Sequence, residues 1–387
     1  MSRFLAASLI VLATSPVLAQ KATEARKPAP RYFEEGKTDD GARLTYMGDT
    51  PVMFLSGTPE EIGRQHANLA GKSIKPVAAM PKRAVKELGA TNQWPFIAFA
   101  ANTLMSRAPK DQVTELKTLI KAAKLESADL TVGNGLIELR RMGGCSSFVV
   151  MPKKSTTGKL LFGRNFDFPA FGVLDKYHCV FVVKPKGKHA FVSIGYPGLV
   201  GVISGINEHG LAVATLDVYR AGDGSPYFNI KGSPLAMTYR RVLEECKTVE
   251  EAQKVLEDAP RTTYMNLVVC DAKTARTFEL TPKQVGARKP EDMVLSCTNH
   301  FRMEGITANE KCWRYERLTK LRDSKPKLDA KDVHKALDLV NQGDFTLQTM
   351  IFEPEDMKLH LVMGGKAPVS GRPLQVFDLR EWLGTSD

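Results

Sequence analysis

Cys145 follows two glycines, and this short segment is the strongest candidate for chemistry in the sequence. Gly143 and Gly144 let the backbone adopt conformations closed to other residues and let neighbouring groups approach closely. A cysteine thiolate is a nucleophile, whereas a buried neutral thiol is inert. From these three residues alone, the favoured interpretation is a glycine helix cap followed by a strand that begins with an ordinary thiol.

A β-hairpin is predicted directly after this segment. Two apolar runs, residues 145–151 and 159–165, flank a polar turn, which is the pattern of two paired strands. With the turn centred near Ser155, Cys145 lies opposite about Asn165 on the return strand. The charged residues around Asn165 are thereby brought beside the thiol.

Arg164 and Asp167 are those charged residues. A guanidinium next to a thiol favours the thiolate, which is the reactive form. Strand alternation puts Arg164 and Asp167 on opposite faces, so Asp167 needs a bulge or a strand end to reach the same place. The alternative interpretation of the two residues is a surface ion pair of little energetic value.

Histidines offer a second route to an active thiol, with His209 or His300 as the base. His209 lies in a predicted hairpin turn, where a solvated residue is expected. His300 would serve Cys145 only if the fold brings the two within hydrogen-bonding reach. The surroundings typical of a papain-like cysteine are absent, as are the HExxH, P-loop and GxSxG patterns. Asn299 closes a predicted strand, where asparagine is common because it forms turns.

The order and spacing of several motifs resemble those of the N-terminal-nucleophile hydrolases, above all the isopenicillin-N acyltransferase-like autoproteolytic enzymes. Choloylglycine hydrolases, penicillin V acylases and acid ceramidase share the same core pattern. The resemblance covers about residues 145–380, and 43–144 only loosely, through Gly57–Ala67. The motifs are Gly144-Cys145-Ser146-Ser147, Gly163-Arg164-Asn165-x-Asp167-Phe168, the run Gly205-Ile206-Asn207-Glu208-His209-Gly210-Leu211, Thr298-Asn299-His300-Phe301, Arg314-x-x-Arg317-Leu318, Met363-Gly364-Gly365 and Phe377-Asp378-Leu379.

This resemblance implies that Cys145 attacks the carbonyl of Gly144 in a precursor chain. An N-to-S shift followed by hydrolysis would leave Cys145 as a new N-terminus. Its α-amino group, with an ordinary pKa of about 8, would then act as the base for its own thiol. Arg164 would tune the thiol, and Asp167 would hold the amino group.

The resemblance also implies how the reaction's oxyanion is stabilised. The side-chain amide of Asn299 would donate to it, and such a donor is worth about 3 kcal/mol. Arg314 matches a distant arginine that braces the site. Asp217 lies where relatives supply a second oxyanion contact, and because a carboxylate is a poor donor, its backbone N–H is the expected contributor.

The elements that must position these residues change character at Gly144. Residues 43–144 are mainly helical after two short strands, and Thr58-Pro59-Glu60-Glu61 is a strong helix start with a capping box. Antiparallel hairpins and paired helices then predict an α+β fold, and with the resemblance a four-layer αββα N-terminal-nucleophile hydrolase sandwich. Strands are expected at 177–184, 189–195, 199–206, 211–218, 264–270, 275–280, 293–298, 346–352 and 357–363, and helices at 110–124, 130–141, 233–246, 309–321 and 330–341.

The N-terminal residues predict export to the periplasm or the medium. Arg3 precedes an apolar run, and Val17 and Ala19 are small residues typical of a signal-peptidase site, so residues 1–19 are a predicted signal peptide. The run is too short to span a bilayer, and no later segment predicts an integral membrane helix. Residues 20–42 are expected to be a flexible lead-in, 43–144 a smaller subunit and 145–387 the catalytic region.

The charge distribution and the cysteine spacing argue against some classes of partner and cofactor. The net charge of +11 comes from basic residues scattered among acidic ones, which favours a solvated basic surface over nucleic-acid binding. The six cysteines follow no CxxC or CxxH spacing, so neither a metal site nor a cofactor is expected. Cys179 and Cys270 lie in apolar runs and are expected to be inert, while pairing among other thiols is left open.

The sequence therefore predicts an exported, self-cleaving cysteine amidohydrolase or acyltransferase. Its partners would be a small linear amide, such as an N-acyl amide or a penicillin-like or bile-salt-like conjugate, and its own cleaved N-terminal subunit. Hydrolysis is preferred because export removes the protein from acyl-CoA donors. Apolar residues after Asp167 could line an acyl pocket, although core packing is their more common role; they are Phe166, Phe168, Phe171 and Leu174. The alternative is an exported β-rich binding or envelope protein in which Cys145 is inert.

Overall fold

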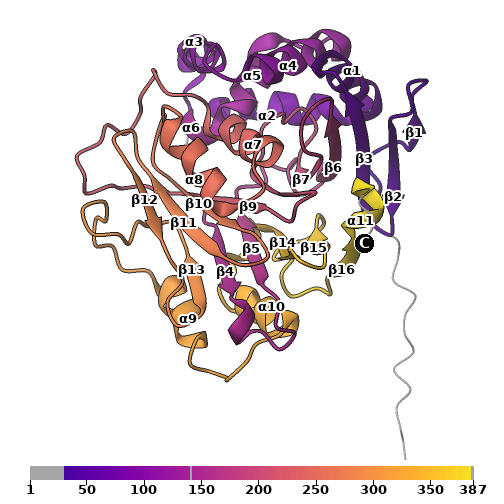
Figure 1. Ribbon diagram of the computed structural model, residues 1–387. Coiled ribbons are helices and arrows are strands. Elements are labelled where there is room, and N and C mark those ends of the chain that lie inside the picture. Colours follow the sequence, from indigo (N-terminus) through magenta and orange to yellow (C-terminus); the bar gives the residue numbers. More distant parts are fainter. Residues whose placement is uncertain (1–29, 140–141, 385–387) are drawn as a thin grey trace, which may run out of the picture. The chain divides into compact units, whose positions relative to one another are not determined.

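Two β-sheets organise the chain in a computed structural model, which describes residues 30–139 and 142–384 (Figure 1). The unit that starts at Arg31 contains all the elements named here. The larger sheet has the order β1 (Gly36–Lys37), β2 (Arg43–Met47), β3 (Thr50–Gly57), β6 (Cys179–Pro185), β7 (Phe191–Gly195), β8 (Ser204–Asn207), β9 (Ala212–Asp217), β10 (Met265–Cys270), β11 (Ala275–Leu280) and β12 (Val285–Arg288). The smaller sheet has the order β13 (Val294–Cys297), β4 (Ser146–Val150), β5 (Leu161–Asp167), β14 (Thr346–Glu353), β15 (Lys358–Met363) and β16 (Gln375–Asp378).

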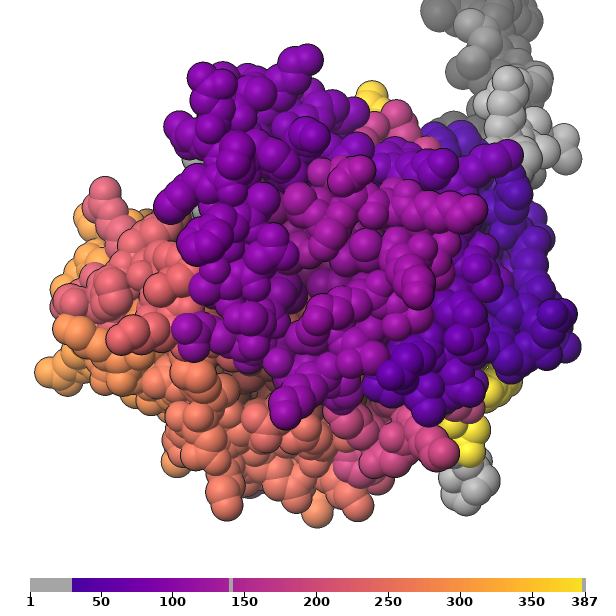
Figure 2. Space-filling view, turned by 90° about the horizontal axis from the view of Figure 1, so that it is seen from above, coloured from indigo at the N-terminus to yellow at the C-terminus, as the bar shows by residue number. Residues whose placement is uncertain are grey.

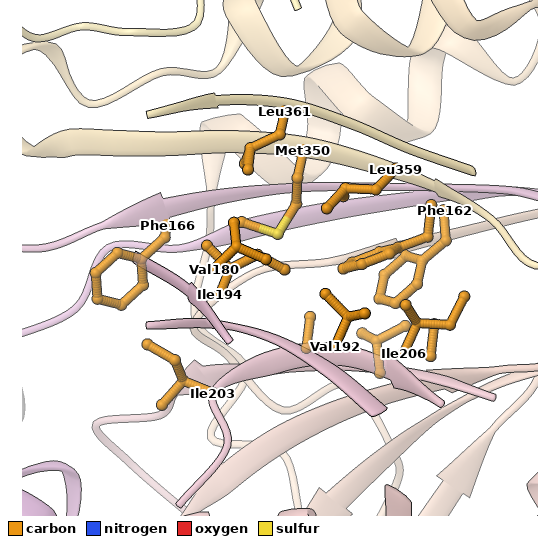
Figure 3. Packing of buried hydrophobic residues seen from close by; sticks show 14 of the residues in the cluster. Phe162, Phe166, Val180, Val192, Ile194, Ile203, Ile206, Met350, Leu359 and Leu361 are labelled. Carbon is orange, nitrogen blue, oxygen red and sulfur yellow. The ribbon is translucent and has the colours of Figure 1, made fainter. Parts of the chain in front are cut away.

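The two sheets pack face to face through apolar side chains (Figure 3). Phe162 and Met350 of the smaller sheet and Val192 and Ile206 of the larger sheet are all fully buried in this layer. Along each strand every second side chain enters the layer, as the pleat of a β-strand requires. The core between the sheets is therefore built by strands that the hairpin patterns predict.

Helices cover the outer face of each sheet. A second apolar cluster joins the larger sheet to α1, α2, α4, α5, α7 and α8, and a third joins the smaller sheet to α9 and α10. The resulting order, helices, sheet, sheet, helices, confirms the expected four-layer αββα fold. The helices are α1 (Pro59–Ala70), α2 (Ile74–Glu87), α3 (Trp94–Met105), α4 (Lys110–Ala123), α5 (Ser127–Asn134), α6 (Leu136–Leu139), α7 (Leu235–Glu245), α8 (Val249–Asp258), α9 (Trp313–Leu321), α10 (Ala330–Leu339) and α11 (Leu379–Leu383).

The segment before Gly144 is built into this fold. Its strand β3 pairs with β2 on one side and with β6 on the other, and β3–β6 is the parallel pair in sheets that are otherwise antiparallel. Its helix α1 packs against both α4 and β3. Figure 2 shows the indigo and purple atoms of this segment forming much of one face, beside the orange atoms of later residues.

The predictions for the N-terminal part of the chain concern the start of α1, the lead-in and the signal peptide. Thr58 caps α1, and Glu61 completes the capping box, as the sequence indicates. The lead-in is ordered earlier than expected, because Phe33 is buried in the core and β1 pairs with β2. The signal peptide expected at residues 1–19 lies outside the described residues. No helix in the described part of the chain is long and apolar enough to cross a membrane.

Candidate active site

Cys145 lies directly before β4, at the start of the predicted hairpin. Ser146 pairs with Asn165 across β4 and β5, so the expected register, with Cys145 opposite Asn165, is displaced by one residue. Asp167 is the last residue of β5, and the β14 strand opposite it has a register irregularity at Thr346. Asp167 thus lies at a strand end, one of the two features that it was expected to need, and the opposite strand is irregular there.

Arg164 contacts the thiol. Its Nη2 lies 3.3 Å from the Sγ of Cys145, while its Nη1 donates to the carbonyl of Ile203 at 2.7 Å and to the hydroxyl of Ser204. The side chain is fully buried. A surface ion pair is therefore not the role of this residue, and its charge is directed at Cys145.

Burial governs the protonation of the Cys145 thiol. The pKa of this group is raised because the thiol is removed from water, and Arg164 lowers the pKa by less than burial raises it. Arg164 thus favours the thiolate, as expected, but in the intact chain burial outweighs it and the thiol stays protonated at neutral pH. Activation of Cys145 requires a base, and the permanently protonated guanidinium of Arg164 cannot be that base.

Asp167 is a buried carboxyl group beside the thiol. Its Oδ1 accepts a hydrogen bond from the hydroxyl of Thr346 at 2.6 Å, and its carbonyl accepts one from the N–H of Gly144 at 2.8 Å. Burial raises its pKa to about 7, although Thr346 and Arg314 act in the opposite direction. Within the described residues, its Oδ2 has no hydrogen-bond partner. The group is therefore suited to gain and lose a proton near neutral pH.

Arg314 and Asn299 bind the backbone on either side of the Gly144–Cys145 bond. Nη1 of Arg314 donates to the carbonyl of Gly144 and, at 2.6 Å, to the carbonyl of Cys145. Nη2 of Arg314 donates to the Oδ1 of Asn299 at 2.9 Å, and the Nδ2 of Asn299 donates to the carbonyl of Gly143 at 3.3 Å. In the intact chain, the donor on the Gly144 carbonyl is thus the arginine and not the asparagine.

Asp217 holds the glycine segment by accepting hydrogen bonds rather than by donating them. Its Oδ2 accepts from the N–H of Gly143 at 2.8 Å, and its carbonyl accepts from Asn299 at 2.7 Å. The hydroxyl of Tyr219 donates to the carbonyl of Gly143 at 2.9 Å. A Cβ on Gly143 would lie 2.8 Å from Oδ2 of Asp217, whereas a Cβ on Gly144 would lie no closer than 3.4 Å to Gln342. Only glycine fits at Gly143 without displacing Asp217.

His300 interacts with Glu310 and with Cys312. Its Nδ1 lies 3.1 Å from Glu310, and its pKa is raised mainly by a hydrogen bond with Cys312. Burial raises the pKa of the Cys312 thiol, but the opposing interactions, of which the hydrogen bonds with His300 and Thr298 are the largest, together lower the pKa by more than burial raises it. The resulting pKa is about 6. No hydrogen bond between His300 and Cys145 occurs in residues 30–139 and 142–384. The described contacts of His300 are thus with Glu310 and Cys312, and they give no support to His300 as the base for Cys145.

An apolar cavity opens beside the thiol. Its volume of about 90 Å³ is several times the roughly 10–15 Å³ that one water molecule needs. Phe166, Phe168 and Leu174 line it, as the acyl-pocket interpretation requires, and they also belong to the core between the sheets. Phe171 packs against that core and does not line the cavity. Helices from the N-terminal segment close the other side, through Val77, Met80, Pro81, Leu130 and Leu136.

Comparison with known families identifies the family of this chain. A model of the acyl-coenzyme A:6-aminopenicillanic acid acyl-transferase family matches residues 153–368, which is more than half of the chain. The chain belongs to this family. The family resemblance stated from the motifs is thereby confirmed.

Individual relatives are distant. An uncharacterized protein of Archaeoglobus fulgidus is 22% identical over 360 residues, covering 76% of this chain, and the chain spans 58% of that protein's length. A Caenorhabditis elegans orthologue of N-acylethanolamine-hydrolyzing acid amidase is 16% identical, with a TM-score of 0.45 over 60% of this chain and all of the other. Penicillin V acylase from Agrobacterium tumefaciens is 17% identical, with a TM-score of 0.42 over 61% of this chain and 87% of the other. At these values the solved structures establish no activity for this chain.

Two contacts of the site were missed in the sequence. Tyr219 follows Asp217 by two residues, and an aromatic hydroxyl so close to a predicted site residue was a usable signal. Thr346 reaches Asp167 across the β5–β14 pair, which joins residues far apart in the chain. Because no local pattern reports that pairing, Thr346 could not be found from the sequence.

Proposed function

We propose that this protein is an exported cysteine amidase or acyltransferase that frees its nucleophile, Cys145, by cleaving its own chain after Gly144. One observation carries the proposal. The Gly144 carbonyl accepts a hydrogen bond from the buried cation of Arg314, directly beside a thiol that Arg164 contacts at 3.3 Å. A carbonyl held by a cationic donor next to a thiol is the arrangement that attack on that carbonyl needs.

The chemistry of self-cleavage follows from these contacts. The Sγ of Cys145 forms a bond to the carbonyl carbon of Gly144, and negative charge moves onto the carbonyl oxygen that Arg314 holds. The C–N bond then breaks, the nitrogen of Cys145 takes up the proton that the thiol lost, and a thioester remains. Asp167, with a pKa of about 7, is the group placed to carry this proton. Water hydrolyses the thioester, so cleavage adds one water molecule to the protein.

The free enzyme would then use the same groups on a substrate. The new α-amino group of Cys145 has an ordinary pKa of about 8 and can act as the base for the thiol. The Oδ2 of Asp167, which lacks a partner among the described residues, is a suitable acceptor for this amino group. Departure of residues 142–144 would remove the carbonyl groups of Gly143 and Gly144, to which Asn299, Arg314 and Tyr219 donate, so that a substrate carbonyl could take their place.

The substrate is proposed to be a linear carboxamide with an apolar acyl group. Support comes from the cavity beside Cys145, whose lining is mainly apolar. The polar side chains at its boundary are few and include those of Asn134, Arg164, Tyr196, Thr215 and Asp217. An apolar acyl chain buried there would leave the carboxamide at the thiol. Hydrolysis is the preferred outcome, because an exported protein does not meet acyl-CoA. Transfer of the acyl group from the Cys145 thioester to an amine is the alternative within the same mechanism.

Fragment masses test the proposal. Wild-type protein on a denaturing gel, with intact mass, is expected to give a chain that begins at Cys145 and a smaller chain that begins near Gln20. Cys145→Ala is expected to stay whole. Cys246→Ala, at a buried thiol that caps α7, serves as the control and is expected to be cut like the wild type.

The result that contradicts the proposal is a wild-type chain that stays whole and carries no selectively labelled Cys145. That outcome favours the non-enzymatic binding protein. The cleaved protein is then assayed with N-acyl amides, bile-salt conjugates, penicillins and short peptides. Turnover that disappears in Cys145→Ala assigns the substrate.

A further inference from the structure

Three side chains meet at the end of the larger sheet that lies away from Cys145. His189 lies two residues before β7, and Glu208 and His209 lie in the turn between β8 and β9. Their side chains are 22%, 26% and 32% exposed, so they are reachable from solvent without being free in it. Strand β9 runs from this turn to Asp217, which places the cluster at the opposite end of β9 from the catalytic groups.

The three potential ligand atoms form a triangle of suitable size for one metal ion. Nδ1 of His189 lies 3.3 Å from Oε1 of Glu208 and 3.1 Å from Nε2 of His209, and Oε1 lies 3.8 Å from Nε2. A circle through three points with these separations has a radius of about 2.0 Å. Zinc binds imidazole nitrogen at about 2.0–2.1 Å and carboxylate oxygen at about 2.0–2.2 Å. An ion slightly out of the triangle's plane would therefore reach all three atoms where they already stand.

The turn that carries two of these ligands is rigid. Asn207, which is fully buried, accepts hydrogen bonds at its Oδ1 from the N–H groups of His209 and Leu211, both at 3.0 Å. Its Nδ2 donates to the carbonyls of Leu243 and Cys246 at 2.9 and 2.7 Å. This network fastens the turn to the end of α7. Little conformational freedom is left to lose when an ion binds.

The second turn is fastened to the same helix. The N–H of His189 donates to the carbonyl of Glu244 at 3.0 Å, and the N–H of Glu208 donates to the carbonyl of Ala190 at 2.9 Å. The backbone thus fixes where each ligand side chain starts. Convergence of two imidazoles and a carboxylate on rigid turns is the arrangement of a preformed site.

We propose that His189, Glu208 and His209 bind a zinc ion, with water in a fourth position. Two imidazoles and one carboxylate are a ligand set that zinc prefers, and a tetrahedral ion accepts the observed separations. Because the site joins two turns and lies away from Cys145, the ion stabilises the fold and takes no part in amide chemistry. The proposal does not depend on the proposed function.

Zinc titration of metal-free protein, purified without a histidine tag, tests this site. One ion per chain is expected in calorimetry, and at about 100 times the dissociation constant the unfolding temperature should rise by roughly 5 °C. His209→Ala is expected to lose the binding. Glu208→Gln keeps the side-chain shape and should weaken binding by more than the roughly 10–100-fold that loss of an outer partner costs. Cobalt in place of zinc should give the intense visible bands of a tetrahedral ion.

A matched control is available in the same protein. His360 pairs with Glu353 on the smaller sheet, so His360→Ala removes a histidine next to a carboxylate elsewhere. This variant is expected to bind zinc like the wild type. The proposal is overturned if the wild type takes up no zinc, or if His360→Ala and His209→Ala lose the ion equally. The three side chains would then be a hydrogen-bonded cluster only.

Discussion

Replacement of Arg314 by glutamine is expected to slow self-cleavage by about 100- to 1,000-fold. The Nη1 of this residue donates to the oxygen that becomes negatively charged when Cys145 attacks Gly144. The arginine is 6% exposed, so water does not screen its charge or replace its hydrogen bonds. Loss of one donor to an oxyanion costs about 2.7–4 kcal/mol in transition-state stabilisation, which gives this range.

The measurement is a time course on a denaturing gel, with intact mass to identify the chain that begins at Cys145. Arg317→Gln is the matched control, because Arg317 lies one turn further along α9 and is exposed. It donates to the carbonyl of Leu339 at 3.1 Å, outside the site. Circular dichroism must show that both variants are folded. If Arg314→Gln is cleaved at the wild-type rate, Arg314 does not stabilise the oxyanion. If both variants are slowed equally, the cause is a disturbance of helix α9 and not the loss of the donor.

Three further predictions concern neighbouring groups. Gly143→Ala places a methyl group 2.8 Å from Asp217 and should slow cleavage at least about tenfold in the same gel assay, whereas Gly144→Ala should be cut nearly normally. In uncleaved Cys145→Ala protein, burial raises the pKa of Asp167 to about 7. Between about pH 4 and pH 7 the unfolded chain has released this proton and the folded chain still holds it, so the free energy of unfolding falls as the pH rises through this range. Adding Asp167→Asn should therefore increase the denaturant-unfolding free energy little near pH 4 and by up to about 4 kcal/mol above pH 7; a gain independent of pH contradicts this. Cys312, with a pKa lowered to about 6, should react with iodoacetamide at pH 7 even in Cys145→Ala, and peptide mass mapping that finds this thiol unlabelled argues against the lowered pKa.

Local patterns in the sequence predicted local structure well. The capping box at Thr58 and the β4–β5 hairpin depend on residues close together in the chain, so their signals are complete in a short window. The helix α9 begins four residues later than expected, at Trp313, since a helix boundary depends on its surroundings. The parallel pairing of β3 with β6 joins residues far apart and leaves no local signal.

In the site, too, contacts between residues close together in the chain were predicted, and contacts between distant residues were not. Arg164 was placed beside Cys145 by hairpin geometry alone, and the structure agrees. The hydrogen bond from Arg314 to the Gly144 carbonyl joins residues that are 170 positions apart in the chain. The resemblance indicated only that this arginine braces the site. The sequence indicated that Arg164 favours the thiolate, but not that burial outweighs the guanidinium, because burial is a property of the folded chain. The cluster of His189, Glu208 and His209 was missed because its residues come from two separate segments and follow no recognised spacing.

The position of β3 between β2 and β6 has a consequence for how this protein can regain its structure. Once the chain is cleaved as proposed, the larger sheet consists of strands from two separate polypeptides. A chain that begins at Cys145 and is made alone would leave the edge of β6 unpaired, which invites aggregation. Before cleavage, refolding is unimolecular; afterwards it requires the two chains to meet, so recovery from denaturant becomes dependent on concentration. Self-cleavage would thus turn a reversible fold into one that is assembled once and preserved by its unfolding barrier.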